Sequence, residues 1–428
     1  MHELTKLIKD DMIKALGVTE PGAIAFAVSK AKSYTSGELK HIEVVLNSGM
    51  YKNAYTCGIP NSDNYGILYA AALGYIAGDY NLGLETLKNV KEDDNLDAKN
   101  LIDNNQISTK LHSISSKIYI EINLETTNDK VKLIIKDKHT NIVKIIVNDK
   151  VLLDDDKDLN NDYSENSENN ETKLIHKYTL KQIIEYVNTV SIDEISFVKE
   201  AYDVNLELFD EALKSNRTTF TKSLYKSNNN KIISSSEKDS ALLLCASAIE
   251  ARVIGLNKPA MSITGSGAHG IIATLPLYAV YKINNYSEEK LYRATILSYL
   301  ICTYIKEYSG KLSAFCGCGI AAGTGMAMAV TYLKGGDYNQ IEYTLNNMAS
   351  SITGMICDGG NQGCTMKAVA ALETAFSSVN FALDNVHIDN IHGIIGKTAE
   401  ETMKNIGLIA SPGMIKTEET IIDIFKNK

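Results

Sequence analysis

Apolar residues recur at helical spacing through the first part of the chain, with one clear interruption. Leu4–Leu16 shows this spacing, Gly17–Pro21 breaks it, and Gly22–Tyr34 continues as an alanine-rich segment. We therefore predict two helices, with Thr19 as a cap of the second. Two further helices are predicted at Tyr65–Gly78 and Leu82–Val90.

Four shorter segments are rich in β-branched residues and are predicted as strands. They are His41–Asn47, Lys117–Leu124, Val131–Asp137 and Ile142–Val147. The last three are separated by short polar turns, which predicts a meander. His139 lies in the second turn, and its position alone favours a turn residue over a site residue.

The chain beyond residue 178 shows a helical pattern. Helices are predicted at Tyr178–Val190, Ile192–Lys214, Lys238–Leu256, Ile271–Lys282, Ser287–Tyr308, Leu312–Leu333, Ile341–Ile352 and Thr365–Leu383. The run Leu312–Leu333 carries no charge, but its Gly, Ala, Ser and Met content favours a buried helix over a membrane span. The acidic run 154–172 is expected to be a surface linker.

These patterns predict an α+β fold with a small mixed sheet part and a larger, mainly helical part. We divide the chain into a helix and strand segment at 1–95, a β-meander part at 96–190 and a helical domain at 191–428. The first segment contains a long polar loop, Ser48–Asp63, and loops of this length are often functional.

Composition narrows the class of protein. The net charge is -9, and no basic patch is apparent, which argues against a nucleic-acid partner. Charged residues lie among the apolar ones in the first ten positions, so we expect no signal peptide and a cytoplasmic protein. Seven cysteines in a reducing compartment suggest metal or redox chemistry, or core filling, before disulfides.

Three cysteines lie in two glycine-rich runs. Cys316 is in one run, and Cys357 and Cys364 flank a turn in the other. Three thiolates can hold a [4Fe-4S] cluster whose fourth iron is open to a substrate, and a zinc ion is the rival. Buried cysteines without metal are the third reading. If residues 316–318 are helical, Cys318 points to another face than Cys316.

A further glycine-rich run, Thr264–Gly270, contains no cysteine and matches G-x-G-x-x-G. No convincing strand is predicted before it, so we reject a dinucleotide site. The run opens the helix Ile271–Lys282, whose free N–H groups suit a carboxylate, although tight-turn glycines explain it equally well. Lys306 is a candidate for holding a carboxylate or orienting a leaving group, with a solvated lysine as the alternative.

Six motifs occur in an order that resembles the L-cysteine desulfidase family, which is related to the iron–sulfur L-serine dehydratases. They read L-G-V-T-E-P, K-N-A-Y-T-C-G-I-P, H-T-N-I-V, G-S-G-A-H-G, L-S-A-F-C-G-C-G and M-I-C-D-G-G-N-Q-G-C. The resemblance implies β-elimination that depends on a [4Fe-4S] cluster and uses no pyridoxal phosphate. Cysteine and water would give pyruvate, ammonia and hydrogen sulfide.

The resemblance also implies the site residues. The cluster ligands would be Cys316, Cys357 and Cys364, and Lys306 would act in catalysis. The substrate, a small amino acid, would be bound by Thr19, Asn47, Ser48, Asn53, His139, Thr264, Gly265, Ser266 and Gly267. A homodimer is an expectation for the assembly, and no membrane partner is expected.

The chain departs from the family's motif at one decisive position. Val18 stands where the family has the cysteine expected to remove the α-proton, and Val18 cannot take a proton. Cys57, Glu20 or His269 could act as base instead. Alternatively, the substrate is other than cysteine, with serine as the second choice, or the protein is a cluster-binding sensor without lyase activity. A zinc hydrolase is the third alternative.

Overall fold

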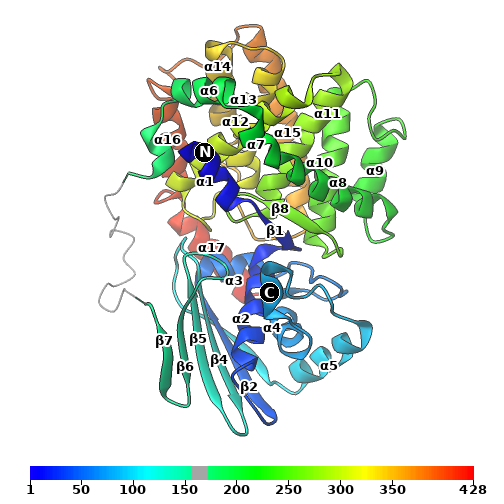
Figure 1. Cartoon of the computed structure of the whole chain (residues 1–428), viewed down its shortest axis with the longest axis vertical. Helices are drawn as coiled ribbons and strands as arrows, with labels where there is room; N and C mark the ends of the chain where they lie inside the picture. The colour runs from blue at the N-terminus through cyan, green and yellow to red at the C-terminus, as the bar shows by residue number, and fades with distance from the viewer. Residues whose placement is uncertain (157–171) are drawn as a thin grey trace.

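The computed structural model describes residues 1–156 and 172–428. It has two parts, a sheet part that is lower in Figure 1 and a helical body above it. A six-stranded mixed sheet and a two-stranded sheet accompany the helices, which confirms the predicted α+β class. Most of the predicted acidic linker, 154–172, lies outside the described residues.

The helices and strands follow one another in three stretches of the described chain. The first stretch holds α1 (Glu3–Asp11), β1 (Ile13–Leu16), α2 (Thr19–Lys32), β2 (Leu39–Leu46), α3 (Ser48–Ala54), α4 (Gly66–Ile76), η1 (Tyr80–Glu85) and α5 (Glu92–Asp103). The second holds β3 (Ile107–Leu111), β4 (Tyr119–Thr126), β5 (Lys130–Lys136), β6 (Ile142–Val147) and β7 (Lys150–Asp154). The third holds η2 (Leu174–Lys177), α6 (Leu180–Thr189), α7 (Ile192–Ile195), η3 (Ser196–Val198), α8 (Lys199–Lys214), α9 (Phe220–Ser227), α10 (Glu237–Val253), β8 (Pro259–Ser262), α11 (Gly267–Asn284), α12 (Glu288–Ser309), η4 (Cys318–Ala322), α13 (Gly323–Leu333), α14 (Tyr338–Ile352), α15 (Gly363–Leu383), α16 (Ala399–Ala410) and α17 (Ile415–Lys426).

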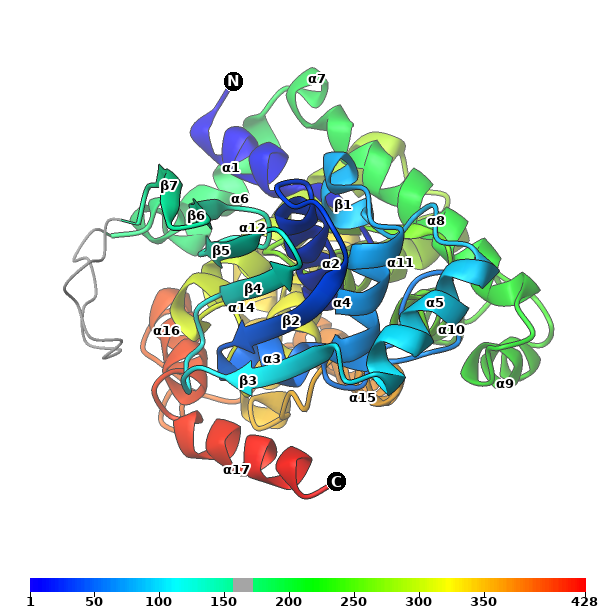
Figure 2. The same cartoon turned by 90° about the horizontal axis from the view of Figure 1, so that it is seen from below.

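The large sheet has the strand order β3-β2-β4-β5-β6-β7. Strands β2 and β3 are parallel and the other neighbours are antiparallel, so the sheet is mixed. The predicted meander is confirmed as β4, β5 and β6. Alternate residues such as Ile120, Ile122 and Leu124 are buried against α2 and α4, which lie over one face of the sheet (Figure 2).

The helical body surrounds α10, which is buried along nearly its whole length. Alanines and leucines from α10, α11, α12, α13 and α15 form one large core. Because α10 is covered on all sides, a charged residue on it is removed from water, and Arg252 in its last turn is such a residue.

A short sheet joins the N-terminus to the helical body. Leu4–Leu16 was predicted as one helix, but α1 ends at Asp11, and β1 pairs antiparallel with β8 (Figure 1). The prediction that no strand precedes the glycine run was therefore wrong, because a strand of four residues is too short to show a period. Two antiparallel strands form no βαβ unit, so the rejection of a dinucleotide site is unaffected.

Four other local predictions were wrong for physical reasons. Val18, not Thr19, is the N-cap of α2. The loop expected at Ser48–Asp63 begins with helix α3. Gly83 has a φ of 55°, and the 3-10 helix Tyr80–Glu85 followed by turns replaces the α-helix predicted at Leu82–Val90. The run Leu312–Leu333 is α-helical only from Gly323 onward, after a π-helical turn.

No helix among residues 1–156 and 172–428 has both the length and the apolar content that crossing a bilayer requires.

The C-terminal helix α17 returns to the sheet part and packs against α3 (Figure 2). The ring of Tyr55 stacks on that of Phe425 at 4.6 Å, and its hydroxyl donates to the Phe425 carbonyl. A buried ion pair of 2.7 Å joins Lys52 to Glu418. These contacts close one side of the junction between the two parts.

Candidate functional site

The two cysteine runs lie side by side although about forty residues separate them. Phe315 and Ile356 form an antiparallel β-bridge. The Cys316 amide donates to the Met355 carbonyl at 3.0 Å, and the Cys357 amide donates to the Ala314 carbonyl at 2.6 Å. These backbone bonds hold Cys316 and Cys357, the first cysteine of each run, on adjacent paired segments.

Cys318 faces Cys316, contrary to the prediction from helical spacing. Residues 316–318 lie between a β-bridge and a π-helical turn, so the i and i+2 side chains are not on opposite faces of an α-helix. The Cys318 thiol donates a hydrogen bond that lowers the pKa of Cys316 to about 7, while the same contact raises the pKa of Cys318.

Cys357 and Cys364 complete a group of four thiols that influence one another electrostatically. Burial raises the pKa of both, that of Cys364 to about 12, while the Lys367 ammonium opposes the rise. Cys364 also lies in the first turn of α15, where the helix dipole favours a thiolate. Lys367 is itself held by an ion pair with Asp358.

The donor set fits a cluster. Within 1–156 and 172–428, no three His, Cys, Asp or Glu side chains are grouped so that they could share one metal ion. A four-iron cluster offers a separate iron to each thiolate, so its ligands surround a common space instead of meeting at one atom. The thiols of Cys316, Cys318, Cys357 and Cys364 influence one another electrostatically, so donors of the required kind are gathered in one neighbourhood.

The second cysteine run packs against the N-terminal motifs. A Cβ placed on Gly360 would lie 2.7 Å from Val18 Cγ1, and the Gly360 amide donates to the Asn53 carbonyl at 3.3 Å. Gly359 has a φ of 102° and would clash with the Lys52 carbonyl if it carried a side chain. Only glycine therefore allows this close approach.

Glu20 is a buried carboxylate that remains ionised. Its oxygens accept hydrogen bonds of 3.0 Å from Thr19 Oγ1 and Asn53 Nδ2. Burial alone would raise the pKa of Glu20, but His139, Arg252 and Asn53 together lower it to about 2. His139 Nε2 is 3.8 Å from Glu20 Oε1, which is too far for a hydrogen bond, so the ring is a close neighbour of the carboxylate without bonding to it directly.

His139 connects Glu20 to the glycine run. A Cβ on Gly265 would lie 3.5 Å from the His139 ring. Thr264 Oγ1 lies 2.5 Å from His269 Nδ1 and donates to the Ile263 carbonyl at 2.7 Å. Since the single hydroxyl proton is used there, His269 Nδ1 donates to Thr264, which leaves Nε2 as an acceptor.

His269 is a neutral imidazole beside the first cysteine run. Burial lowers the pKa of His269 well below its usual value, and the charges of Lys306 and Arg252 lower it further. A Cβ on Gly317, the residue between Cys316 and Cys318, would lie 2.7 Å from His269 Nε2. The acceptor nitrogen therefore lies against the backbone between Cys316 and Cys318.

Lys306 is buried, not solvated, and it also contacts Gly317. Its Nζ donates to the carbonyl oxygens of Gly310 at 2.8 Å and Lys311 at 3.2 Å. Burial lowers the pKa of Lys306 to about 8, with a further contribution from Lys311. A neutral amine has two N–H bonds, which the two carbonyls accept, and one lone pair that remains free.

Cys57, Asn47 and Ser48 have other surroundings. Cys57 is fully buried, its thiol points to the Ala54 carbonyl at 3.5 Å, and burial raises its pKa strongly. Asn47 Nδ2 donates to two carbonyls of the 115–117 loop, and Ser48 Oγ accepts from the Ser115 amide. Asn47 and Ser48 thus anchor that loop.

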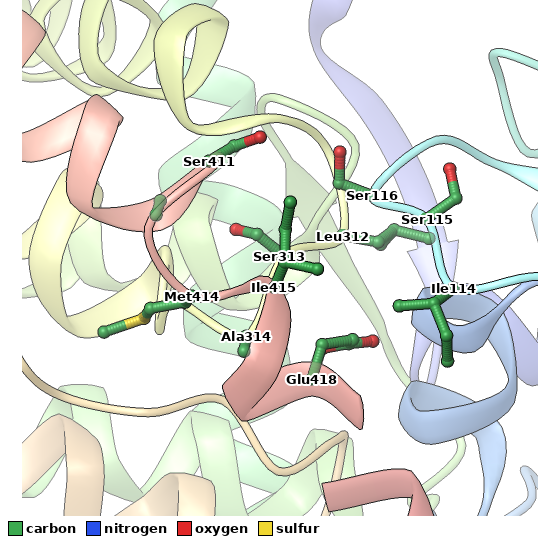
Figure 3. Close-up of a pocket in the computed structure, with 11 residues that line it drawn as sticks. Ile114, Ser115, Ser116, Leu312, Ser313, Ala314, Ser411, Met414, Ile415 and Glu418 are labelled. Atoms are coloured by element: carbon green, nitrogen blue, oxygen red, sulfur yellow. The ribbon is translucent and has the colours of Figure 1, made fainter. Parts of the chain in front are cut away.

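A small cavity lies on the closed side of the junction (Figure 3). It has a volume of about 20 Å³, enough for one water molecule. Glu418 Oε1 and Ser313 Oγ line it and accept no hydrogen bond from the described residues. Its lining contains no cysteine, so it is distinct from the thiol site.

Sequence reasoning missed Arg252. This side chain is 4 % exposed, and it contributes to the electrostatics of Glu20, Cys57 and His269. The available signal was an arginine inside an otherwise apolar helical segment, Lys238–Leu256. Asp11 was missed as well; its carboxylate accepts from the Thr264 amide and fixes the start of the glycine run.

The structure is that of a two-part α+β protein in which the cysteine runs lie at the junction and Glu20, His269 and Lys306 are buried there. Residues 81–423 match the family model described as serine dehydratase alpha chain. The chain therefore belongs to the serine dehydratase alpha chain family, and its coarse class is a serine dehydratase-like lyase. This confirms the family relationship predicted from the motifs.

Relatives span the whole chain. A UPF0597 protein of Clostridium botulinum strain Hall is 42 % identical over 421 residues, which are 98 % of this chain and 97 % of the relative. A UPF0597 protein of Clostridium tetani is 34 % identical over 425 residues, 99 % of this chain and 98 % of its own. A UPF0597 protein of Caldanaerobacter subterraneus matches to the same extent.

Proposed function

We propose that this chain is a [4Fe-4S]-dependent lyase that eliminates the β-substituent of a small amino acid. L-Cysteine is the first expected substrate and L-serine the second. The carrying observation is that the two cysteine runs, the Leu16–Pro21 motif and the glycine run, far apart in the chain, meet at one junction. A cytoplasmic location and a homodimer remain predictions.

Cys316, Cys357 and Cys364 are the proposed cluster ligands. When bound, the cluster supplies an open iron that acts as a Lewis acid toward the leaving thiolate or hydroxyl group. The mutual electrostatic influence of these thiols supports the assignment. Cys318 is proposed to keep its proton and donate to Cys316, because its own pKa is raised.

Lys306 is the proposed base that takes the α-proton. A general base works best when its pKa is near the working pH, and the pKa of Lys306 is lowered to about 8. The lone pair on Nζ stays available while both N–H bonds are held by carbonyls. Glu20 is too weak a base, and the Cys57 thiol holds its proton too firmly.

His269 is proposed to assist near the thiols. Its neutral ring presents Nε2 toward Gly317, where it can accept a proton or a hydrogen bond from the substrate. Thr264 fixes this tautomer, so Thr264 is a positioning residue in this proposal.

A cluster-binding sensor without lyase activity is the second candidate. It is favoured by Val18, which is buried against Gly360 at the place of the family's thiol base. Anaerobic purification, an absorbance spectrum and a pyruvate assay over a panel of β-substituted amino acids separate the two. Pyruvate from any member supports the lyase, and an intact cluster without product supports the sensor.

A further inference from the structure

Arg252 is the most buried of the three arginines of this chain. Arg217 donates to the carbonyl oxygen of Ile254 at 2.7 Å, and Arg293 donates to Glu289 at 2.9 Å. Within residues 1–156 and 172–428, no hydrogen bond or ion pair engages the Arg252 guanidinium, and its Nε is fully enclosed.

A buried guanidinium without an anion is unfavourable because it has lost its hydration without a compensating charge. Arg252 nevertheless sits on the rigid, fully packed helix α10 and cannot retreat to solvent. A buried guanidinium costs little net free energy where an anionic ligand supplies the missing charge and hydrogen-bond acceptors.

The start of helix α11 provides further donors beside Arg252. A Cβ on Gly267 would lie 2.8 Å from Arg252 Nε, so a larger residue would displace the guanidinium. Ser266, the N-cap, makes no side-chain capping bond. The N–H groups of Gly267 and Ala268 find no acceptor in the described part of the chain. Free N–H groups and a guanidinium together suit a carboxylate.

Glu20 supplies the opposite charge at the same site. Glu20 and Arg252 influence each other electrostatically, yet they are not within the 4.0 Å of an ion pair. A buried cation and a buried anion that are held apart match the two charges of an α-amino acid.

We propose that Arg252, with the N-terminus of α11, binds the α-carboxylate of the substrate while Glu20 faces its ammonium group. The inference rests on the proposed function and narrows its substrate class to free α-amino acids, excluding amides, esters and peptides. Lys306 and His269 then remain for the reacting carbon and the leaving group.

Ligands without a leaving group test this independently of catalysis. Binding of L-alanine, L-alaninamide and propanoate to the anaerobically purified full-length protein is measured by calorimetry. L-Alanine is expected to bind about 10-fold or more tightly than either analogue, because each analogue lacks one charged contact. Equal binding of L-alanine and L-alaninamide would overturn the role of Arg252.

Variants locate the effect. Arg252→Lys and Arg252→Gln are expected to weaken L-alanine binding about 10- to 100-fold and to leave L-alaninamide binding unchanged. Among turned-over substrates, KM should rise by a similar factor, more than kcat falls. Arg217→Lys, the matched control, should change neither affinity. A parallel loss of both ligands would mean a structural role and contradict the proposal.

The two proposals fail in different ways. Selective L-alanine binding without pyruvate from any substrate would overturn the lyase and support the carboxylate site. Pyruvate formation together with equal binding of the three ligands would support the lyase and overturn the carboxylate site. If the Arg252 variants do not fold, the three-ligand comparison on the unaltered protein still decides.

Discussion

Two buried cations lie at the junction of the sheet part and the helical body, and their surroundings differ. Lys52 on α3 donates to the Glu418 carboxylate at 2.7 Å and to the Ser313 carbonyl at 3.1 Å. Among residues 1–156 and 172–428, Arg252 on α10 has neither kind of partner, and its Nε is enclosed. Both side chains are almost inaccessible. Their burial is the same, so the completeness of their hydrogen bonds distinguishes them.

The two sides of the junction differ in the same way, in how completely their buried polar groups are hydrogen-bonded. On the closed side, α17 supplies partners for Lys52 and Tyr55. The other side, which we call the open side, holds Arg252 and Lys306. In the part of the chain that the structure describes, Arg252 is unpaired there and Lys306 has one free position. We infer that the closed side maintains the fold and that the open side is arranged for a ligand. Each prediction below tests one part of this contrast.

The largest effect is expected from Lys306 on the open side. Lys306→Met should lower kcat by about 10²- to 10⁴-fold, the usual contribution of a general base, without lowering the unfolding midpoint. In the unaltered protein, kcat should rise as the pH passes about 8, because burial favours the neutral amine above that value.

The exposed neighbour Lys311 provides the control for this variant, since Lys311→Met removes a charge of the same kind nearby. Its turnover should stay within about two-fold of the unaltered protein. Retention of more than a tenth of the activity by Lys306→Met would rule out Lys306 as the base.

A loss of stability is expected from Lys52 on the closed side. Lys52→Met should lower the free energy of unfolding by about 3–5 kcal/mol, because it leaves the buried Glu418 carboxylate unpaired. Lys52→Met combined with Glu418→Leu should recover part of this loss. Chemical denaturation measures both. Lys416→Met removes an exposed pair and should cost less than about 1 kcal/mol. A double variant as unstable as the single one would contradict this account.

A smaller effect is expected from Cys57. Cys57→Ala should leave turnover within about two-fold and cost about 1 kcal/mol of stability, since a buried thiol that keeps its proton contributes only packing. Pyruvate formation and thermal unfolding are the measurements. A large loss of kcat with an unchanged fold would instead make Cys57 the replacement for the family's thiol base.

The smallest effect concerns Glu20 in acid. The pKa of Glu20 is depressed to about 2 in the fold, so its contribution to stability is present above its unfolded value and is lost as pH falls between about 5 and 2. Glu20→Gln should therefore flatten the stability profile in that window. Acid titration followed by circular dichroism measures it, and an unchanged slope would contradict the assignment.

Long periodic segments could be predicted from sequence, and short ones could not. The meander and most helices beyond residue 178 follow the pattern within a few residues, since many residues repeat the signal. Strands β1 and β8 have four residues each, and only their partner across the junction makes them strands. Helix α3 has only seven residues, so its period could not be recognised within the polar loop predicted there.

The site could be predicted only as a set of motifs. Sequence spacing did not reveal that Cys316 and Cys318 face each other, because a π-helical turn replaces the expected α-helix. The burial of Lys306 depends on the packing of several helices, and so does the lack of a partner for Arg252 among the described residues. Burial and missing partners are properties of the packed structure, so they cannot be read from the sequence of one helix.

The central claim is a cluster-dependent lyase, and one preparation tests it most directly. The full-length chain is purified without oxygen, analysed for iron and acid-labile sulfide, and assayed for pyruvate with L-cysteine and L-serine. The account predicts about four iron atoms per chain and pyruvate from at least one of the two. Protein that contains no iron, or iron-loaded protein that forms no product, would contradict it.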